Sequence, residues 1–176
     1  MKALHVGCGH GRLPEVIFPW ETWEEVRLDI DPDVMPDVVA SMTEIPLEDA
    51  SFEAVASQHN LEHLRPHDVP VALREFLRVL KPGGFVFIQV PDLGWASKEI
   101  AEGRGGDVAY EAPAGPVTAF DMVYGWSQAT ATNPYMAHHC GFTVDTLRRL
   151  LEFVGFRDVT VRARDWNIDA VAVKHA

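Results

Sequence analysis

The chain has 176 residues, of which 47% are apolar, and a formal net charge of −11. This length and composition suit a single globular domain with a substantial core. The 26 acidic side chains against 15 lysines and arginines oppose binding to a phosphate backbone, so we expect no nucleic-acid partner. No apolar run approaches the length of a membrane span, and no signal-peptide pattern precedes the first strand, so we expect no membrane partner. With only two cysteines, Cys8 and Cys140, the composition favours a reducing compartment, and we expect a cytoplasmic protein.

A glycine-rich loop follows the first strand of the chain. The short apolar run 3–6 leads directly into Gly7, Gly9 and Gly11, which predicts a buried strand that turns sharply and leaves backbone N–H groups free for a ligand. A dinucleotide-binding loop of the G-x-G-x-x-G type would need a glycine at position 12, where Arg12 stands. The G-x-G-x-G spacing, with Cys8 as a small residue in between, therefore favours a different cofactor.

Strand and helix signals alternate along the rest of the chain. Strands are predicted near residues 2–6, 25–29, 36–40, 53–58, 84–90, 158–163 and 169–174, and helices near 11–18, 68–80, 95–102, 118–130 and 143–154. Thr143 suits the N-cap of the last helix, and Gly155 suits its end. This alternation predicts an α/β fold with a mostly parallel sheet and helices on both faces.

Five motifs then occur in a fixed order. They are the loop 7–11, Arg-Leu-Asp-Ile at 27–30, Ile-Pro-Leu at 45–47 with Ser-Phe-Glu-Ala-Val at 51–55, Lys-Pro-Gly-Gly at 81–84, and the helix and its end at 141–156. Together they resemble the class I S-adenosylmethionine-dependent methyltransferases, in particular their small type 11 domains, over about residues 3–92 and 141–174. The resemblance implies a Rossmann-like, seven-stranded, mostly parallel sheet with an antiparallel final strand, and S-adenosylmethionine as the cofactor.

The resemblance also implies a set of cofactor-binding residues. Asp29, twenty residues after Gly9, is expected to accept hydrogen bonds from the ribose hydroxyls, although it could instead only cap the turn at Pro32. The other expected cofactor residues are His5, Gly7, Cys8, Gly9, Gly11, Ile30, Ser41, Met42 and Gln58. His5 stands where relatives usually carry an acid, so we expect weaker or pH-dependent cofactor binding. Glu53 replaces a usual aspartate, and its role is expected to be structural.

Residues just after the fourth strand lie beside the transferred methyl group in the fold that the chain resembles. We therefore expect His59 to be the catalytic residue, as a general base near neutral pH, with a histidine that only packs as the alternative. The candidate substrate contacts are His63, Tyr124, Trp126 and His139. For each of them a purely structural role stays open.

Some of the same residues also allow a different interpretation, as a zinc site. Residues 59–63 spell H-x-x-E-H, the zinc signature of inverted zincins, and His138, His139 and Cys140 could add ligands. This string straddles a strand end and a helix start, and the methyltransferase pattern already accounts for the surrounding chain. We therefore expect no metal.

We interpret residues 1–176 as a single methyltransferase domain with an inserted, lid-like region at about 92–140, too long for an ordinary loop. The N-terminal helices that shelter the cofactor in many relatives are absent from this sequence, so the inserted region is expected to form a lid and substrate pocket, a small core of its own, or both. The expected activity is methyl transfer from S-adenosylmethionine to a small molecule. A non-catalytic binding or scaffold protein and a methyltransferase for a protein partner are the alternatives. An apolar face left by the missing helices also suggests a homodimer.

Overall fold

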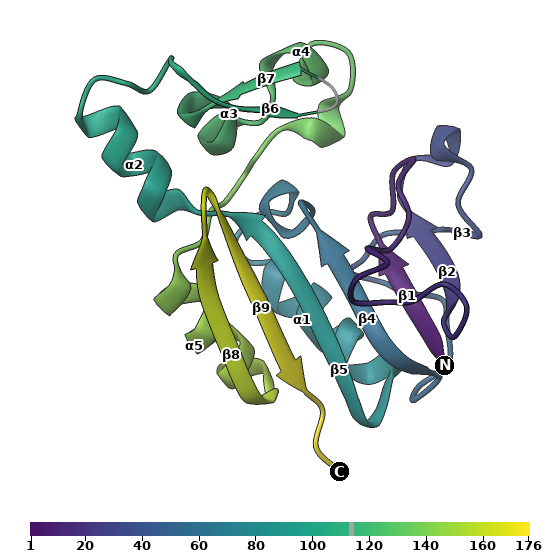
Figure 1. Ribbon diagram of the computed structural model, residues 1–176. Helices are drawn as coiled ribbons and strands as arrows, with labels where there is room; N and C mark the ends of the chain where they lie inside the picture. The colour runs from purple at the N-terminus through teal and green to yellow at the C-terminus, as the bar shows by residue number, and fades with distance from the viewer. Residues whose placement is uncertain (113–114) are drawn as a thin grey trace.

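The computed structural model describes residues 1–112 and 115–176. Seven strands form one sheet in the order β3-β2-β1-β4-β5-β9-β8 (Figure 1). Their bounds are β1 Lys2–Val6, β2 Glu24–Asp29, β3 Val38–Val39, β4 Phe52–Gln58, β5 Leu80–Pro91, β8 Arg157–Arg164 and β9 Asn167–Val173. The first five pair in parallel, and β9 runs antiparallel to both β5 and β8. The expected mostly parallel, seven-stranded sheet with an antiparallel final strand is confirmed.

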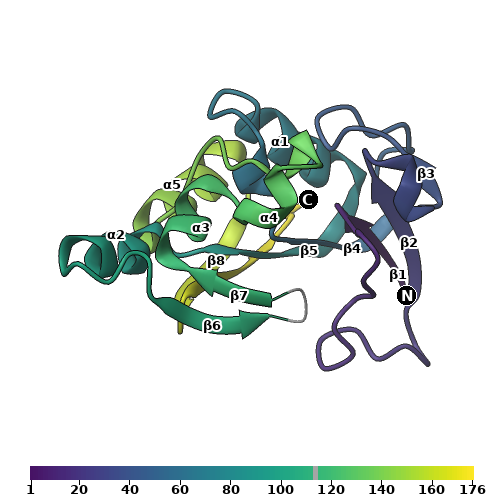
Figure 2. The same cartoon turned by 90° about the horizontal axis from the view of Figure 1, so that it is seen from above.

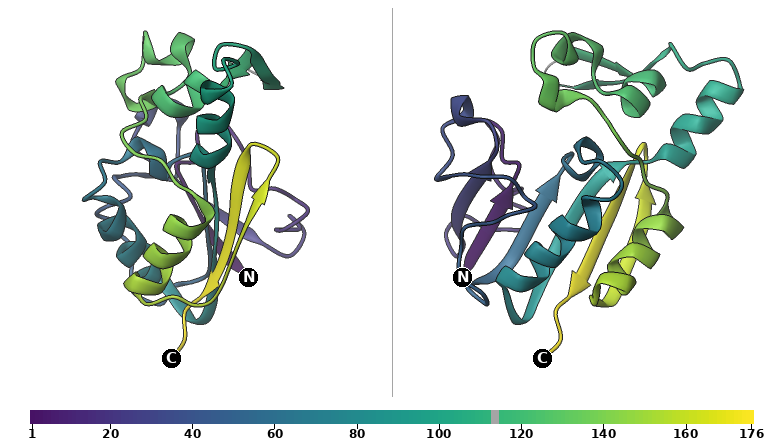
Figure 3. Two further views of the ribbon diagram at one scale, coloured as in Figure 1. Left: turned by 90° about the vertical axis from the view of Figure 1, so that its left-hand side faces the viewer. Right: turned by 180° about the vertical axis from the view of Figure 1, so that it is seen from behind.

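Helices α1 (Val69–Val79) and α5 (Val144–Val154) cover one face of the sheet, as the left view of Figure 3 shows. Their apolar side chains, among them Phe76 and Leu147, are fully buried in the main core against β1, β4 and β5. Helix α5 begins as expected at Thr143, whose hydroxyl accepts the backbone N–H of Thr146. It ends at Gly155, where φ is 123°.

The opposite face is covered by the coil segment 7–23. Leu13 and Phe18 are buried against Ala54, Ala56 and Phe87 of the sheet. The helix expected over 11–18 does not form: Pro14 and Pro19 bound a single turn, in which Phe18 N donates to Pro14 O at 2.9 Å. A residue before proline disfavours the helical backbone, so the turn stops at Phe18. This coil takes the place of the expected helix and covers part of the face that suggested a homodimer, which stays a prediction.

Short elements surround the strand ends on the β2–β3 side and after β4. The 3-10 helix η1 (Pro32–Val34) follows β2, and η2 (Leu61–His63) follows β4.

The order of the strands reverses between β1 and β4, because β2 and β3 lie on one side of β1 and β4 lies on the other. In open α/β sheets, ligands bind outside the carboxyl ends of the strands at such a switch point.

The inserted region lies over these carboxyl ends (Figures 1 and 2). It contains α2 Leu93–Ala101, β6 Val108–Ala112, β7 Gly115–Thr118, α3 Ala119–Tyr124, α4 Ser127–Thr130 and η3 Pro134–Met136. The single helix expected over 118–130 is split at Gly125, where φ is 95°. The region has a small core of its own around Ala96, Ala119 and Met122, and Tyr110 stacks on Trp166 of the β8–β9 turn at 4.4 Å between ring centroids.

Candidate active site

A cavity of about 350 Å³ lies at the carboxyl ends of β1, β2 and β4, below the inserted region. This volume is in the range of small-molecule sites. The sheet contributes the loop after β1, the end of β2 and the segments after β3 and β4, and the inserted region contributes residues 133–136 and His139. The cavity therefore joins the two parts of the chain that the sequence treated as cofactor domain and lid.

The glycine loop reaches the cavity through two of its three glycines. Gly7 and Gly9 line it, with φ angles of 61° and 49°, left-handed values that glycine adopts most readily. A Cβ on Gly9 would meet no atom within 4 Å, so the space beside this glycine is open. Gly11 does not line the cavity.

Asp29 lines the cavity at the end of β2 and fixes the glycine loop to that strand. Its carboxylate accepts the backbone N–H of Gly9 at 2.8 Å and that of Asp31 at 3.0 Å. The cap of the following 3-10 helix is Asp31, which accepts the N–H of Asp33 at 2.9 Å. Each Asp29 oxygen has a further lone pair, so this carboxylate can hold the loop and still accept from a ligand hydroxyl.

Ile30, Ser41 and Met42 also line the cavity, as their sequence positions suggested. Ile30 follows β2, and the other two follow β3, so together they form one wall. The Ser41 hydroxyl lies 2.7 Å from that of Thr43, which holds the turn after β3. A wall of two apolar side chains beside an acid suits a flat heterocycle next to a polyhydroxylated ring.

Besides Gly11, three expected cofactor residues lie outside the cavity. Side chains alternate along β1, so His5 is buried on the opposite face of the sheet from Val6, which lines the cavity. The Nδ1 atom of His5 lies 2.7 Å from Glu25 Oε1. Burial lowers the pKa of His5 more than Glu25 raises it. Gln58 points to Gln89, with 3.5 Å between the two amide groups. Cys8 is buried outside the cavity, and burial raises the pKa of its thiol to about 11.

His59 lines the cavity and has a left-handed backbone, with φ of 52°. Such a conformation is uncommon for a residue with a Cβ and clusters at functional sites. Its backbone N–H donates to Gln89 O of β5 at 2.8 Å, which holds the turn. Burial lowers the pKa of the His59 ring, but the nearby Glu62 carboxylate outweighs this and the pKa is raised overall.

Of the expected substrate contacts, the structure brings two to the cavity. His63 and His139 line it. Tyr124 does not, because it ends α3 with 68% of its surface exposed. Trp126 is turned into the inserted region, where its ring N–H donates to Pro116 O at 3.1 Å.

Further lining residues were not singled out from the sequence. Asn60 donates through Nδ2 to Val6 O at 2.8 Å and to Gln58 O at 2.9 Å, and so ties together the ends of β1 and β4. Asn133 of the inserted region reaches Asp31 across the cavity at 3.4 Å. Tyr135 and Met136 complete this side.

The match to a known protein family ends just before the inserted region. Residues 4–88 match a family model described as a methyltransferase domain. Residues 4–88 are thus a methyltransferase domain, and the chain is similar to the class I S-adenosylmethionine-dependent methyltransferases. No curated protein matches the sequence.

Solved structures share the fold of this methyltransferase over nearly all of its length. A Methanosarcina mazei S-adenosylmethionine-dependent methyltransferase is 18% identical, with 99% of this chain and 92% of that one covered and a TM-score of 0.66. A putative methyltransferase in complex with the Haloferax volcanii activator Trm112 is 14% identical, with 99% and 83% covered and a TM-score of 0.64.

A third similar structure holds ligands. It is the Burkholderia thailandensis 1,6-didemethyltoxoflavin-N1-methyltransferase, with its substrate and S-adenosylhomocysteine bound. It is 18% identical, with 99% of this chain and 71% of that one covered and a TM-score of 0.61.

In the described part of this chain, every helix falls short of the length and apolarity that crossing a membrane requires.

Proposed function

We propose that this methyltransferase transfers the methyl group of S-adenosylmethionine to a small molecule bound in the cavity beneath the inserted region. The observation that carries the proposal is the composition of that cavity. Gly7, Gly9 and Asp29 line it from the sheet, and Tyr135 and His139 line it from the inserted region. One cavity can therefore receive a cofactor on the sheet side and an acceptor on the other.

Methyl transfer requires alignment of the reacting atoms and exclusion of water more than it requires reactive side chains. When bound, S-adenosylmethionine would supply an electrophilic methyl group, which an acceptor lone pair would displace from the sulfonium to leave a neutral thioether. Holding the two atoms in line and excluding water supplies most of the acceleration. We propose that residues 133–136 cover the reacting centre as the lid part of the inserted region, which therefore both packs on itself and closes the cavity.

His59 is our proposed proton acceptor. It lines the cavity just after β4, and half of its side chain is within reach of a ligand because 41% is exposed. An acceptor hydroxyl or ammonium would lose its proton to this ring as the new bond to the methyl carbon forms. His63 and His139 are proposed to contact the acceptor.

The acidic chain and the small volume of the cavity favour a small acceptor over a nucleic acid or a protein segment. We also propose a cytoplasmic location, because Cys8 and Cys140 are free thiols. A role as a non-catalytic binding protein predicts the same cofactor binding without turnover, and a protein acceptor predicts methyl uptake by a macromolecule.

Titration calorimetry with S-adenosylmethionine, S-adenosylhomocysteine and NADH tests the cofactor assignment. Micromolar binding of both sulfur nucleosides, with no signal from NADH, is expected. Gly9→Leu places a side chain where the loop backbone must approach the cofactor and is expected to abolish that signal. S-adenosylhomocysteine production with a pool of small metabolites then tests turnover. Failure of both sulfur nucleosides to bind would contradict the proposal.

A further inference from the structure

Glu62 carries a buried carboxylate without a hydrogen-bond partner. Its side chain is 2% exposed, and among the residues that the structure describes neither Oε1 nor Oε2 accepts a hydrogen bond. A buried charge is costly unless it is paired or binds a metal. The His59 imidazole also lies near this carboxylate, but its Nδ1 is 3.6 Å from Oε1, beyond hydrogen-bond distance. Something further is needed to compensate this carboxylate.

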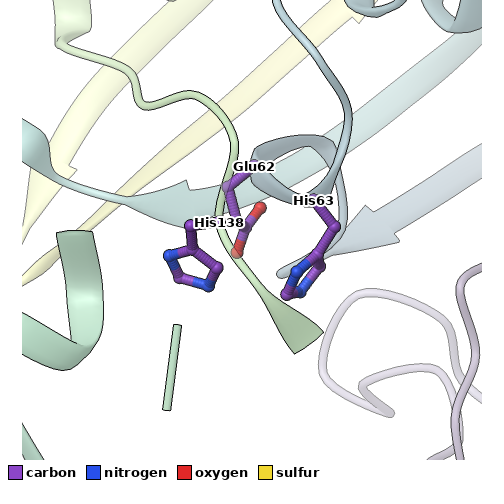
Figure 4. A group of neighbouring side chains, drawn as sticks. All are labelled: Glu62, His63 and His138. Atoms are coloured by element: carbon purple, nitrogen blue, oxygen red, sulfur yellow. The ribbon is translucent and has the colours of Figure 1, made fainter. Parts of the chain in front are cut away.

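Two imidazole rings face the same carboxylate. Glu62, His63 and His138 each offer one ligand atom, and these atoms lie within 4.8 Å of one another. The two rings are 4.8 Å apart between centroids, and Figure 4 shows the carboxylate between them. Glu62 and His63 come from η2 after β4, whereas His138 comes from the inserted region. The tertiary fold thus assembles the group from both parts of the chain.

The other ring nitrogen of each histidine is already engaged. His63 Nδ1 lies 3.1 Å from Ala137 O, and His138 Nδ1 lies 2.9 Å from Met122 O. A carbonyl oxygen only accepts, so each Nδ1 carries a proton, and the nitrogen left to bind a metal is Nε2. Metal-binding histidines are typically oriented by a bond of this kind.

We propose that Glu62, His63 and His138 bind one divalent transition-metal ion beside the cavity. Two imidazoles and a carboxylate suit zinc, cobalt, nickel or iron better than magnesium or calcium, which prefer oxygen ligands. A tetrahedral ion holds its donor atoms about 3.4 Å apart, so these side chains need to approach one another by at most about 1.4 Å. Cys140 is not a ligand, because its thiol donates to Leu61 O at 3.3 Å and burial raises its pKa to about 12.

This arrangement differs from that of an inverted zincin. Leu61–His63 is a single 3-10 turn, and His59 lies before it with a left-handed backbone, so the two histidines of H-x-x-E-H do not follow each other on one α-helix. His138, from the inserted region, replaces His59 as the second imidazole.

The position of the ion gives it a role that rests on the proposed function. His63 lines the cavity, and three protein ligands leave a coordination position open. That position would hold an oxygen of the acceptor, so the class of acceptor that this site favours has a hydroxyl or carboxylate next to the methylated atom.

Metal binding by the whole chain tests the proposal. The protein is stripped with a chelator, titrated with Co²⁺ while visible absorption is recorded, and dialysed against Zn²⁺ for elemental analysis. One equivalent per chain is expected, with ligand-field bands typical of a low-coordinate site. Glu62→Gln and His138→Gln are each expected to weaken Co²⁺ binding at least 10-fold. His175→Gln, which removes an exposed imidazole that pairs with Asp158, is the matched control and should bind as the unaltered chain does.

Thermal unfolding of each variant shows whether it folds, and the measurement on the unaltered chain stands whatever the variants do. Less than a tenth of an equivalent of metal on the unaltered chain, or unchanged binding by a folded Glu62→Gln, would overturn the proposal. Calorimetry with S-adenosylhomocysteine on the stripped protein separates the two ideas. Nucleoside binding without metal uptake rejects the metal site alone, and metal uptake without nucleoside binding rejects the proposed function alone.

Discussion

Replacement of Gly7 by alanine tests how the glycine loop is held, and its cost can be worked out from the structure. Gly7 has φ of 61°, and a Cβ there would lie 1.8 Å from Asn60 Oδ1 and 2.1 Å from Asn60 Cγ. Such distances are impossible, so the Asn60 side chain must move. It would then lose Nδ2 bonds to Val6 O, Gln58 O and Gly7 O.

The expected loss of unfolding free energy has two parts. A left-handed backbone costs a residue with a Cβ about 1–2 kcal/mol, and each lost hydrogen bond costs about 0.5–1.5 kcal/mol. Asn60 Nδ2 has two hydrogens, so the loss amounts to about two hydrogen bonds. Gly7→Ala should therefore destabilise the protein by about 2–5 kcal/mol, measured by equilibrium unfolding in urea. Gly9→Ala is the matched control, because φ is 49° and a Cβ there meets no atom within 4 Å. Its expected cost is the backbone part alone, about 1–2 kcal/mol.

A double-mutant cycle isolates the clash. Asn60→Ala already lacks the side chain that blocks the new methyl group, so adding Gly7→Ala to it should cost only about 1–2 kcal/mol more. Equal losses for Gly7→Ala and Gly9→Ala, or a full loss for Gly7→Ala in the Asn60→Ala background, would refute the reasoning.

Three further predictions concern the site and one ion pair. Asp29→Asn should weaken S-adenosylhomocysteine binding by about 1–3 kcal/mol, roughly 5- to 150-fold in Kd, because a charge-assisted acceptor is lost; calorimetry measures this, and an unchanged Kd would remove Asp29 from the cofactor site. His59→Gln should lower kcat by about 10²–10⁴ for an acceptor that must lose a proton, with the Kd for S-adenosylhomocysteine within about 3-fold; a kcat equal to that of the exposed control His67→Gln would show that His59 is no base. Glu53 accepts from Lys81 Nζ at 2.5 Å and from Lys2 N at 2.7 Å, and these bonds, the Lys81 bond above all, lower the pKa of Glu53 to about 2. Since this folded-state pKa lies below the ordinary value of 4.5, the stabilisation is present above about pH 4.5 and is lost as the pH falls through about 2. Glu53→Gln should then cost about 1 kcal/mol at pH 7, a value reduced for solvent screening, and progressively less in acid; a cost that does not change between pH 7 and pH 3 would contradict this account.

Local signals were sufficient where a few neighbouring residues decide the structure. The strands at 2–6 and 53–58 follow from short apolar runs, and Thr143 and Gly155 mark the two ends of α5 as predicted. Gly7, Gly9 and Asp29 reach the cavity because the loop and the strand ends follow directly from those strands.

Predictions failed where the path of the chain depends on packing at a distance. The coil over 7–23 replaces a helix because two prolines restrict the turn and because Leu13 and Phe18 find their burial against β4 and β5. The faces occupied by His5 and Gln58 depend on the sheet register, which places both side chains away from the cavity. Tyr124 and Trp126 were placed in the pocket by position in the chain, but the small core of the inserted region decides where they point.

The resemblance to methyltransferases and the order of the strands along the chain could be predicted from the sequence, because they depend on motifs of a few residues and on periodicity. Which distant residues meet depends on the tertiary structure. Asn133 reaches Asp31, and His138 reaches Glu62, because the inserted region folds back over the carboxyl ends of the strands. No local pattern encodes such a contact, since it depends on the burial and packing of the whole region between them.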